Sequence, residues 1–465
     1  MVTKIFSHIQ NKFQGEVSDR PAWLPFGLAL VMFLFLLIYF FNNILPSINY
    51  HTGRWEAPYL FPLMEPVGGD FRDGYYYPAR TLLEGNSPYL VNGLIYPPFS
   101  ALFSVPFTLF PVETSYAIQV GLLFLLNIAT VLIAIESIRQ ALKQTARLSG
   151  HVFPPTAGLL FVLISFYTLT SYGFIFSAER GNFDIYPQFF SVLALWVLVN
   201  KPSRIWLPVI LISLAAHLKI YPAALFALVL WVHGRKSILP ILATNLFLLF
   251  ITGPLNAIEF IKIITVYALE PHLWVGNHSA ASFTAYLNQY LPERIGMTLP
   301  EWLFYLAPVI LWSGGVLVLW NLGGTWRPLS TVLVFVLSVP LMNLLPSVSH
   351  DYKLVLLSAP LAILLILNFW KLDNARRLSG ATFEILKIIL LMLLMFGIAR
   401  TNVYTHPIFK NKYPLILFLQ FLSILEIVSI TYFRQPLRFL QSHRASPPPY
   451  SEEEDKENLL TLRAP

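Results

Sequence analysis

Residues 205–232 read IWLPVILISLAAHLKIYPAALFALVLWV, and this stretch decides how the chain crosses a membrane. As a single helix, these roughly 28 residues would extend about 42 Å and bury Lys219 near the middle of the bilayer. Pro222 has no amide hydrogen to donate to the carbonyl four residues earlier, which favours a break in the helix. We therefore predict two short helices separated by a break around His217–Lys219. The first helix enters the membrane and the second leaves it on the same side.

The composition is that of a membrane protein. Of the 465 residues, 56% are hydrophobic and only 12% are charged, whereas soluble domains carry about 25% charged residues. The net charge of +7 fits cytoplasmic loops beside anionic lipid head groups, so we expect membrane lipids and no nucleic acid as partners. The chain has no cysteine, which excludes disulfides, thiolate nucleophiles and thiolate metal sites.

Basic residues in the predicted connecting segments orient the spans, because short cytoplasmic loops are enriched in Lys and Arg. Lys201 and Arg204 precede the stretch above and Arg235 follows it, so an even number of crossings separates them. Lys371 marks a later inner loop. We predict an all-α polytopic membrane protein with about twelve spans and both ends in the cytoplasm. The predicted spans are residues 23–45, 115–138, 156–177, 185–200, two within 205–232, 238–254, 301–320, 329–346, 353–370, 384–400 and 414–432.

This topology divides the chain into three parts. Residues 1–22 form a cytoplasmic N-terminus, residues 23–432 form the transmembrane domain, and residues 433–465 form a cytoplasmic tail. The tail is proline-rich and then acidic, a composition typical of disorder. Residues 46–114 form a long extracytoplasmic loop. Within it, residues 95–111 are apolar but short and interrupted by proline, so we predict re-entrant or surface helices there instead of a span.

The long first loop holds the densest group of reactive side chains, including Asp70, Asp73, Tyr75 and Tyr76. A carboxylate near a membrane surface can take a proton from a sugar hydroxyl as a general base. The same two aspartates are typical of a helix start, with Gly85 as the stop. Both interpretations are compatible, because helix N-termini stabilise anions. Most aromatic residues are expected to face lipid or the membrane interface, and a few, such as Tyr75–Tyr77, are candidates for stacking on sugar rings.

Lys219 lies in an apolar stretch, where a charged side chain is costly and indicates a functional site. The alternative is that its long side chain reaches the membrane interface. In the functional interpretation, Lys219 and His217 bind a phosphate group, and Arg180 binds it with two parallel hydrogen bonds. For Arg180 the alternative is a local ion pair with Glu179 or Asp184.

Weaker candidates for substrate binding lie in the other polar segments. They are Asn182, His278, His350 and Lys353, and each histidine is equally compatible with a loop position that has no role. The predicted topology places all these segments on the extracytoplasmic face together with the first loop. The spacing of Asp70 and Asp73 is not specific for metal ligands, so we assign no metal.

Several motifs of this chain resemble those of glycosyltransferase family 87. The first loop carries Asp70-Phe71 through Tyr76-Tyr77, Ala79, Leu82-Leu83, Gly85, Pro88-Tyr89 and Tyr96-Pro97-Pro98-Phe99. Later segments agree in order, namely Gly181-Asn182, Lys219 with Pro222, Gly276-Asn277-His278-Ser279 and the turn Ser347–Tyr352. The resemblance covers residues 70–400 and leaves out the tail.

The resemblance implies a GT-C-type fold and the activity of a polyprenyl-phosphate-mannose-dependent alpha-mannosyltransferase. The donor is then a polyprenyl-phosphate sugar, and the acceptor is a lipid or glycan hydroxyl. No cofactor is implied. We expect a multi-pass enzyme of a prokaryotic plasma membrane with an extracytoplasmic active site. Mannose is the expected sugar, and arabinose or another pentose on the same carrier stays open.

The resemblance also implies a catalytic aspartate in the first loop, before a Tyr-Tyr pair. Asp70 fits because Asp-Phe matches the motif, but its spacing to Tyr75-Tyr76 is about one residue longer than the pattern, so Asp73 is a second candidate. The implied aspartate deprotonates the acceptor, which displaces the lipid phosphate with inversion. Lys219 and Arg180 are then expected to hold the charge of the leaving phosphate.

The alternative function is that of a polytopic secondary transporter or lipid flippase. Such a protein also has about twelve spans and often contains broken helices. A transporter of this kind shows related halves and charges along a path through the membrane. Here the halves look unlike each other and the predicted polar segments gather on one face, which favours an enzyme.

Overall fold

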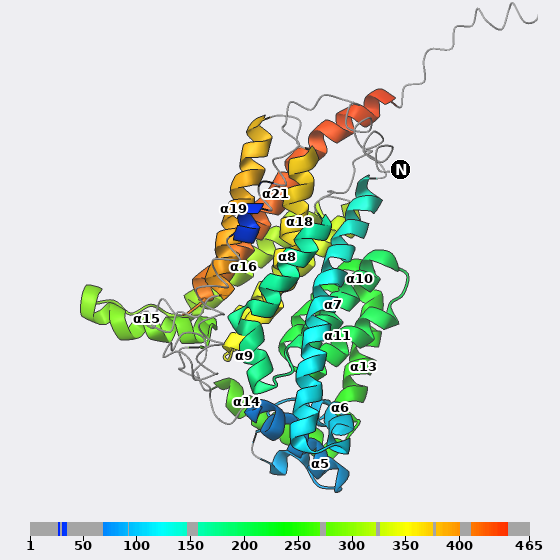
Figure 1. Ribbon diagram of the computed structural model, residues 1–465, viewed down its shortest axis with the longest axis vertical. Helices are drawn as coiled ribbons and strands as arrows, with labels where there is room; N and C mark the ends of the chain where they lie inside the picture. Colours follow the sequence, from blue (N-terminus) through cyan, green and yellow to red (C-terminus); the bar gives the residue numbers. More distant parts are fainter. Residues whose placement is uncertain are drawn as a thin grey trace, which may run out of the picture.

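The computed structural model describes residues 27, 30–34, 68–91, 93–146, 157–269, 276–321, 326–374, 378–399 and 411–444. These residues form a bundle of helices without a β-strand, and the one isolated bridge joins Asn277 to His350 (Figure 1). Seven of the described helices are long and apolar enough to cross a membrane, or eight if one bent pair counts as a span. The protein is therefore an all-α polytopic membrane protein, as predicted.

The number of twelve spans stays a prediction, because part of the chain lies outside the described residues. The N-terminus, most of the predicted first span and the end of the tail fall there. Within the described part, α10 (Ile185–Asn200) and α11 (Trp206–Leu218) are apolar but shorter than the seven candidate spans.

The first long helix, α7 (Val112–Ala146), runs the length of the bundle and sets its direction (Figure 1). The chain returns through α8 (Ala157–Thr170) and α9 (Tyr172–Arg180), which are bent by 52° relative to each other. Ser171 lies at the bend, where its side chain accepts a hydrogen bond from the amide of Phe174 and so caps a new helix. The bend brings the end of α9 to the first loop.

The break predicted within residues 205–232 is present. Helix α11 ends at Leu218, and Lys219 has an extended backbone with φ −151° and ψ 131°. A short 3-10 helix, η5 (Tyr221–Leu225), then leads into α12 (Phe226–His233). Pro222 lies in the first turn of η5, where its missing amide hydrogen breaks no helical hydrogen bond. The reversal places Lys219 at the same end of the bundle as the first loop.

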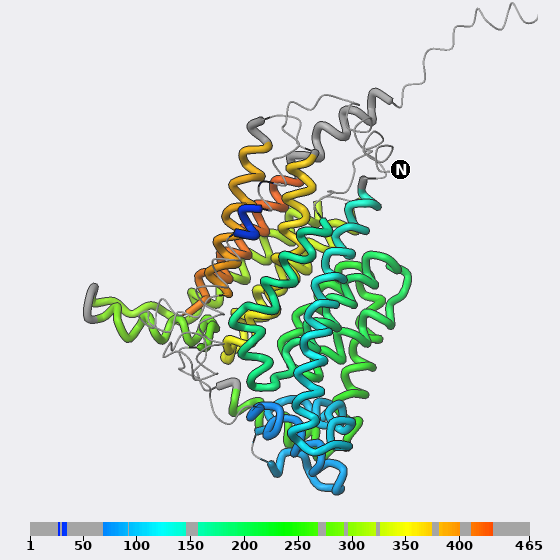
Figure 2. Tube along the Cα trace, viewed as in Figure 1, coloured from blue at the N-terminus to red at the C-terminus, as the bar shows by residue number. Residues whose placement is uncertain are grey.

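The described part of the first loop folds into short helices at one end of the bundle, as Figures 1 and 2 show. A continuous helix begins with α4 (Gly69–Phe71), widens into a π-helical turn, η2 (Arg72–Tyr76), and ends with α5 (Tyr77–Leu83). Helices α6 (Phe99–Ser104) and η4 (Val105–Leu109) follow, and together they are too short to span a membrane. The structure therefore shows short helices within residues 95–111 and no span, while the choice between re-entrant and surface helices stays a prediction.

Helix α14 (Pro254–Leu269) closes the loop region from the second half of the chain. It follows α13 (Ile238–Phe250) at the same end of the bundle, and its Glu259 accepts a hydrogen bond from Ser87 beside the 3-10 helix η3 (Pro88–Leu90). Helix α15 (Ala280–Ile295) instead extends sideways from the bundle (Figure 1). The remaining helices are η6 (Gly234–Ser237), α16 (Glu301–Trp320), α17 (Arg327–Leu344), η8 (Asp351–Leu357), α18 (Ser358–Asn374), α19 (Leu378–Ala399) and α21 (Tyr413–Arg444).

Four buried charges join α18, α19 and α21 inside the bundle. The ammonium of Lys371 lies 2.5 Å from Glu426, and that of Lys387 lies 2.7 Å from both Glu384 and Glu426. Lys371 was expected in a cytoplasmic loop, but it is buried among these partners. Buried charges are tolerated in an apolar bundle only when they are paired, so this network fixes how the three helices pack.

Candidate functional site

The start of the first-loop helix meets the turn that follows α9. The amide of Gly68 donates to the carbonyl of Glu179 at 2.8 Å. Gly68 and Gly181 both have positive φ, at 74° and 65°. A Cβ on Gly181 would lie 2.5 Å from the Cβ of Phe71, so only glycine permits this approach. The contact positions the first turn of the loop helix against the end of α9.

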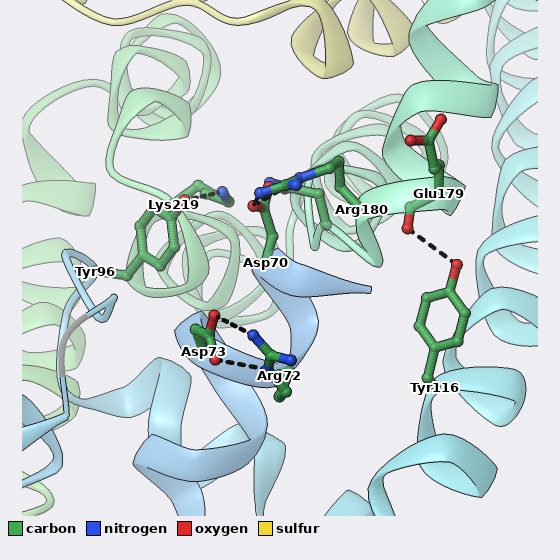
Figure 3. A network of polar contacts seen from close by, with 9 residues as sticks. Asp70, Arg72, Asp73, Tyr96, Tyr116, Glu179, Arg180 and Lys219 are labelled. Atoms are coloured by element: carbon green, nitrogen blue, oxygen red, sulfur yellow. Dashed lines mark hydrogen bonds and ion pairs between the residues drawn. The ribbon is translucent and has the colours of Figure 1, made fainter. Parts of the chain in front are cut away.

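Asp70 lies at this contact and accepts three hydrogen bonds (Figure 3). Its Oδ1 accepts from Nε and Nη2 of Arg180 at 3.0 and 2.5 Å, and its Oδ2 accepts from Nδ2 of Asn182 at 2.9 Å. The structure therefore brings three predicted site residues together. Arg180 pairs with a distant carboxylate, a partner that the sequence did not indicate. The side chain of Asp70 is 25% exposed, so it remains accessible to a ligand.

Asp73 lies on the next turn of the same helix and has a different environment. Arg72 binds both of its carboxylate oxygens, at 2.8 and 3.0 Å (Figure 3). The hydrogen bond and the negative charge of Asp73 raise the pKa of Arg72. The Asp73 side chain is 44% exposed, and its partner is its own neighbour in the chain. Asp70 is thus fixed by distant elements, whereas Asp73 forms a local surface pair.

Both aspartates line a cavity of about 600 Å³. This volume lies within the usual range of small-molecule sites, which is roughly 300–1,000 Å³. Its wall combines two carboxylates, a guanidinium and several aromatic rings, a mixture suited to polar, ring-shaped ligands. The lining residues are Gly69, Asp70, Asp73, Gly74, Tyr75, Gly93, Ile95, Tyr96, Phe176, Arg180, Tyr267, His350 and Tyr352.

The two predicted sugar-stacking tyrosines do not present a free ring face. Tyr75 is stacked on Phe183, with ring centroids 3.7 Å apart, and on Tyr96, with centroids 5.5 Å apart. Burial raises the pKa of Tyr75 well above its ordinary value. Tyr76 lies outside the cavity lining, where its hydroxyl donates to the carbonyl of Phe110 at 2.8 Å. Only the hydroxyl edge of Tyr75 can therefore meet a ligand.

Lys219 lies behind the cavity wall and does not line it. Its side chain is 3% exposed, and its ammonium donates to the hydroxyl of Tyr96 at 2.5 Å (Figure 3). It also lies 3.4 Å from Oδ2 of Asp184. Lys219 is therefore buried within the protein, whereas the alternative interpretation expected its side chain to extend outward to the membrane interface. The functional interpretation expected Lys219 to contact a ligand, but Lys219 is not among the residues that line the cavity.

His217 and Lys353 also lie outside the cavity lining. The imidazole of His217 lies beside Asn245 of α13. The ammonium of Lys353 donates to the carbonyl of Val348 and lies 4.7 Å from the ring centroid of Tyr221. Both residues are buried, and their contacts stabilise the turns around the site.

The two predicted histidines are close in space but have different surroundings. His278 uses both ring nitrogens within the protein, since Nε2 lies 2.7 Å from Asp351 and Nδ1 accepts from the amide of Lys412. This residue joins three loops. His350 pairs with Asn277 through the backbone and lines the cavity. Of the two, His350 is therefore the one placed to contact a ligand.

Several lining residues were not selected from the sequence. Tyr96 was visible only as part of the Tyr-Pro-Pro motif. Phe176 and Tyr267 lie in helices, and no local pattern distinguished them from ordinary apolar residues. Tyr352 belongs to the Ser347–Tyr352 turn, but only the neighbouring histidine and lysine were selected there. Among the described residues, no three His, Cys, Asp or Glu side chains converge as metal ligands would.

Comparison with known protein families identifies the chain. The profile of glycosyltransferase family 87 matches residues 94–397, which is more than half of the 465 residues. The match begins after Asp70 and Asp73, so the importance of these two residues depends on the geometry above. The comparison with curated proteins finds no match. The chain therefore belongs to glycosyltransferase family 87 and is a membrane glycosyltransferase.

Proposed function

We propose that this glycosyltransferase moves a hexose, with mannose as the first candidate, from a polyprenyl-phosphate sugar to a lipid or glycan hydroxyl. The observation that carries the proposal is the position of Asp70 on the cavity wall, where Arg180 and Asn182 hold it. A carboxylate beside a guanidinium supplies a base for an acceptor hydroxyl and a cation for a phosphate within one cavity.

Asp70 is the better candidate for the base than Asp73. A carboxylate offers about four lone-pair sites, and Asp70 uses three of them for Arg180 and Asn182. The remaining site on Oδ2 can accept the proton of a sugar hydroxyl. Within the described residues, the side chain of Asp73 is held by its neighbour Arg72 on a partly exposed part of the helix. A base must keep a defined position relative to the reacting atoms, which favours the aspartate that distant elements fix.

The proposed reaction is a single displacement. The acceptor O–H bond breaks as its oxygen attacks the anomeric carbon, and the proton passes to Asp70. The bond between the anomeric carbon and the phosphate oxygen breaks, and its electron pair leaves with the polyprenyl phosphate. Attack from the opposite face inverts the anomeric centre. Arg180 lines the same cavity, so its positive charge can stabilise the leaving phosphate.

The distribution of basic residues supports an extracytoplasmic cavity. The turns at the far ends of α10, α12 and α16 contain basic residues and no acidic ones, namely Lys201, Arg204, Arg235, Lys236 and Arg327. Such turns are typical of the cytoplasmic side. Helices α9 and α14 contribute Arg180 and Tyr267 to the cavity lining, and both helices lie toward the opposite end of the bundle (Figure 1). Lys412 is a basic residue near the cavity end, but it is buried and donates to the carbonyl of Gly397.

The apolar surface beside the cavity supports a lipid-linked donor. Helix α14 contributes Tyr267 to the cavity lining and exposes Leu255, Ile258 and Val266 along its outer side. An exposed apolar face on a helix at the end of a membrane bundle fits the membrane interface. A donor with a polyprenyl tail can then place its phosphate in the cavity and keep its tail in lipid.

The test is a transfer assay with purified protein in liposomes. The donors are radiolabelled polyprenyl-phosphate mannose, polyprenyl-phosphate arabinose and a nucleotide-linked mannose, with native membrane lipids and glycans as acceptors. We expect label to pass to the acceptor from polyprenyl-phosphate mannose and not from the nucleotide sugar. Transfer from arabinose alone would change the assigned sugar. Transfer only from the nucleotide sugar would overturn the proposed donor class.

A further inference from the structure

Tyr96 forms part of the cavity wall on the other side of Asp70 from Arg180, as seen in Figure 3. Its ring is parallel to that of Tyr75 within 6°, and Phe183 covers the opposite face of Tyr75. Both tyrosines line the cavity. Because the rings are packed face to face, the two tyrosines can meet a ligand through their hydroxyl groups.

The hydroxyl of Tyr96 has a buried cation behind it. The ammonium of Lys219 donates to this hydroxyl at 2.5 Å and lies 3.8 Å from the ring centroid. On its other side, Lys219 lies 3.4 Å from Asp184, whose second oxygen accepts from Tyr221 at 2.5 Å. The shortest contact of the ammonium is therefore with Tyr96, and Tyr96 separates it from the cavity.

The Tyr96 hydroxyl is an acceptor toward Lys219 and a donor toward another group. An ammonium group is a donor only, so the Tyr96 oxygen accepts from Lys219 and must donate its own proton elsewhere. The neighbouring hydroxyl of Tyr75 is buried beside the Tyr96 hydroxyl, and within the described part of the chain it forms no hydrogen bond of good geometry. A buried hydroxyl without a partner is costly, and a ligand in the cavity would satisfy it.

We propose that the hydroxyls of Tyr96 and Tyr75 are a second phosphate-binding edge of the cavity, in addition to Arg180. Tyr96 donates to a phosphate oxygen, and Lys219 is a positioning residue that acts through Tyr96. Its ammonium polarises the Tyr96 hydroxyl and makes it a stronger donor. This inference rests on the proposed polyprenyl-phosphate donor. The sequence predicted that Lys219 binds the phosphate directly, whereas in this arrangement Lys219 acts on the phosphate through Tyr96.

Such an edge would act on the reaction itself. Negative charge accumulates on the phosphate oxygens as the bond to the anomeric carbon breaks. Donors that already point at those oxygens stabilise this charge without reorganisation. Lys219 is buried behind Tyr96, and water-excluded surroundings strengthen the effect of its charge on the half-buried Tyr96 hydroxyl.

Binding measured without turnover tests the proposal. Purified full-length protein is titrated with undecaprenyl phosphate and, separately, with undecaprenol, which lacks the phosphate. Tyr96→Phe removes only the hydroxyl, because the ring and its stacking on Tyr75 remain. We expect Tyr96→Phe to weaken binding of the phosphate roughly tenfold to hundredfold and to leave undecaprenol binding unchanged.

Two further variants separate this role from a structural one. Tyr76→Phe is the matched control, because Tyr76 follows Tyr75 in the same helix and its hydroxyl donates to the carbonyl of Phe110 outside the cavity. It should lower thermal stability and leave the preference for phosphate intact. Lys219→Met is measured together with Asp184→Asn, so that no buried carboxylate is left unpaired. When Lys219→Met and Asp184→Asn are introduced together with Tyr96→Phe, phosphate binding should be little weaker than in Tyr96→Phe alone, because Lys219 acts through Tyr96.

The outcomes distinguish this inference from the proposed function. Wild-type protein that binds both lipids equally would contradict the polyprenyl-phosphate donor and the inference together. Wild-type preference for the phosphate that persists in Tyr96→Phe would overturn the inference alone. Fully additive losses from the changes at Lys219 and Tyr96 would show that Lys219 acts independently of Tyr96.

Discussion

Asp70 accepts two hydrogen bonds from Arg180, a residue 110 positions later in the chain. The pair joins the first turn of the loop helix to the last turn of α9. It therefore fixes the proposed base and the proposed phosphate-binding cation relative to each other. The geometry depends on close backbone contact, which two glycines with positive φ allow.

Gly181→Ala should disrupt this contact. The new Cβ would meet Phe71 at 2.5 Å, and φ of +65° is unfavourable for alanine. We expect a lower melting temperature in detergent and a large loss of transfer activity. Gly85→Ala is the matched control, because Gly85 also has positive φ but has no atom within 4 Å of the added Cβ. Equal effects in both variants would contradict the role of the close contact.

Arg180→Lys should keep the charge but lose the paired hydrogen bonds to Asp70. A lysine cannot reproduce the planar geometry of the guanidinium, so both Asp70 and the phosphate would be held less precisely. We expect kcat/KM for the donor to fall roughly 100-fold to 1,000-fold, as when one transition-state donor is removed. Steady-state kinetics at varied donor concentration measure this change.

Arg72→Lys is the corresponding control for Arg180→Lys. In the part of the chain that the structure describes, Arg72 pairs with the exposed Asp73. A surface pair of this kind contributes little, typically about 0–1 kcal/mol. We expect kcat/KM to stay within about tenfold of the wild type. A larger loss in Arg72→Lys than in Arg180→Lys would move the site of chemistry toward Asp73.

Glu426→Gln should destabilise the helix bundle without altering the site. It removes the carboxylate that both Lys371 and Lys387 bind, so two buried cations would share Glu384 alone. Breaking a buried pair typically costs about 3–5 kcal/mol. Thermal unfolding in detergent should show a marked drop in melting temperature, while the remaining folded protein keeps its kcat.

Glu136→Gln provides the comparison for Glu426→Gln. Glu136 pairs with Arg139 on a partly exposed face of α7. Solvent screens such a pair, so its loss should change the free energy of unfolding by less than about 1 kcal/mol. If both variants unfold at the same temperature, the buried network does not hold α18, α19 and α21 together.

Most of the long apolar helices and the break near Lys219 could be predicted from the sequence, because they depend on local properties. The bend between α8 and α9 and the helices α14 and α15 were not predicted. The length of the apolar segments predicted the long spans. The basic residues on either side of residues 205–232, together with Pro222, predicted two short helices in that stretch. The short helices within residues 95–111 were predicted because the segment is too short to cross a bilayer. Each of these inferences needs only neighbouring residues.

The contacts of the site could be predicted only in part. The sequence indicated Asp70, Arg180 and Asn182 as candidates, but their mutual hydrogen bonds depend on where α9 ends relative to the first loop. The covered faces of Tyr75 and the position of Lys219 behind Tyr96 are consequences of packing between distant segments. Periodicity and composition carry no information on such contacts.

The identity of the base is the central claim, and a comparison of Asp70→Asn with Asp73→Asn tests it most directly. Both changes keep the side-chain shape and remove the charge. The measurement is the rate of sugar transfer from polyprenyl-phosphate mannose by purified protein in liposomes. We predict that Asp70→Asn lowers kcat by roughly 100-fold to 10,000-fold, as loss of a general base does, and that Asp73→Asn stays within about tenfold. Full activity of Asp70→Asn would contradict the account.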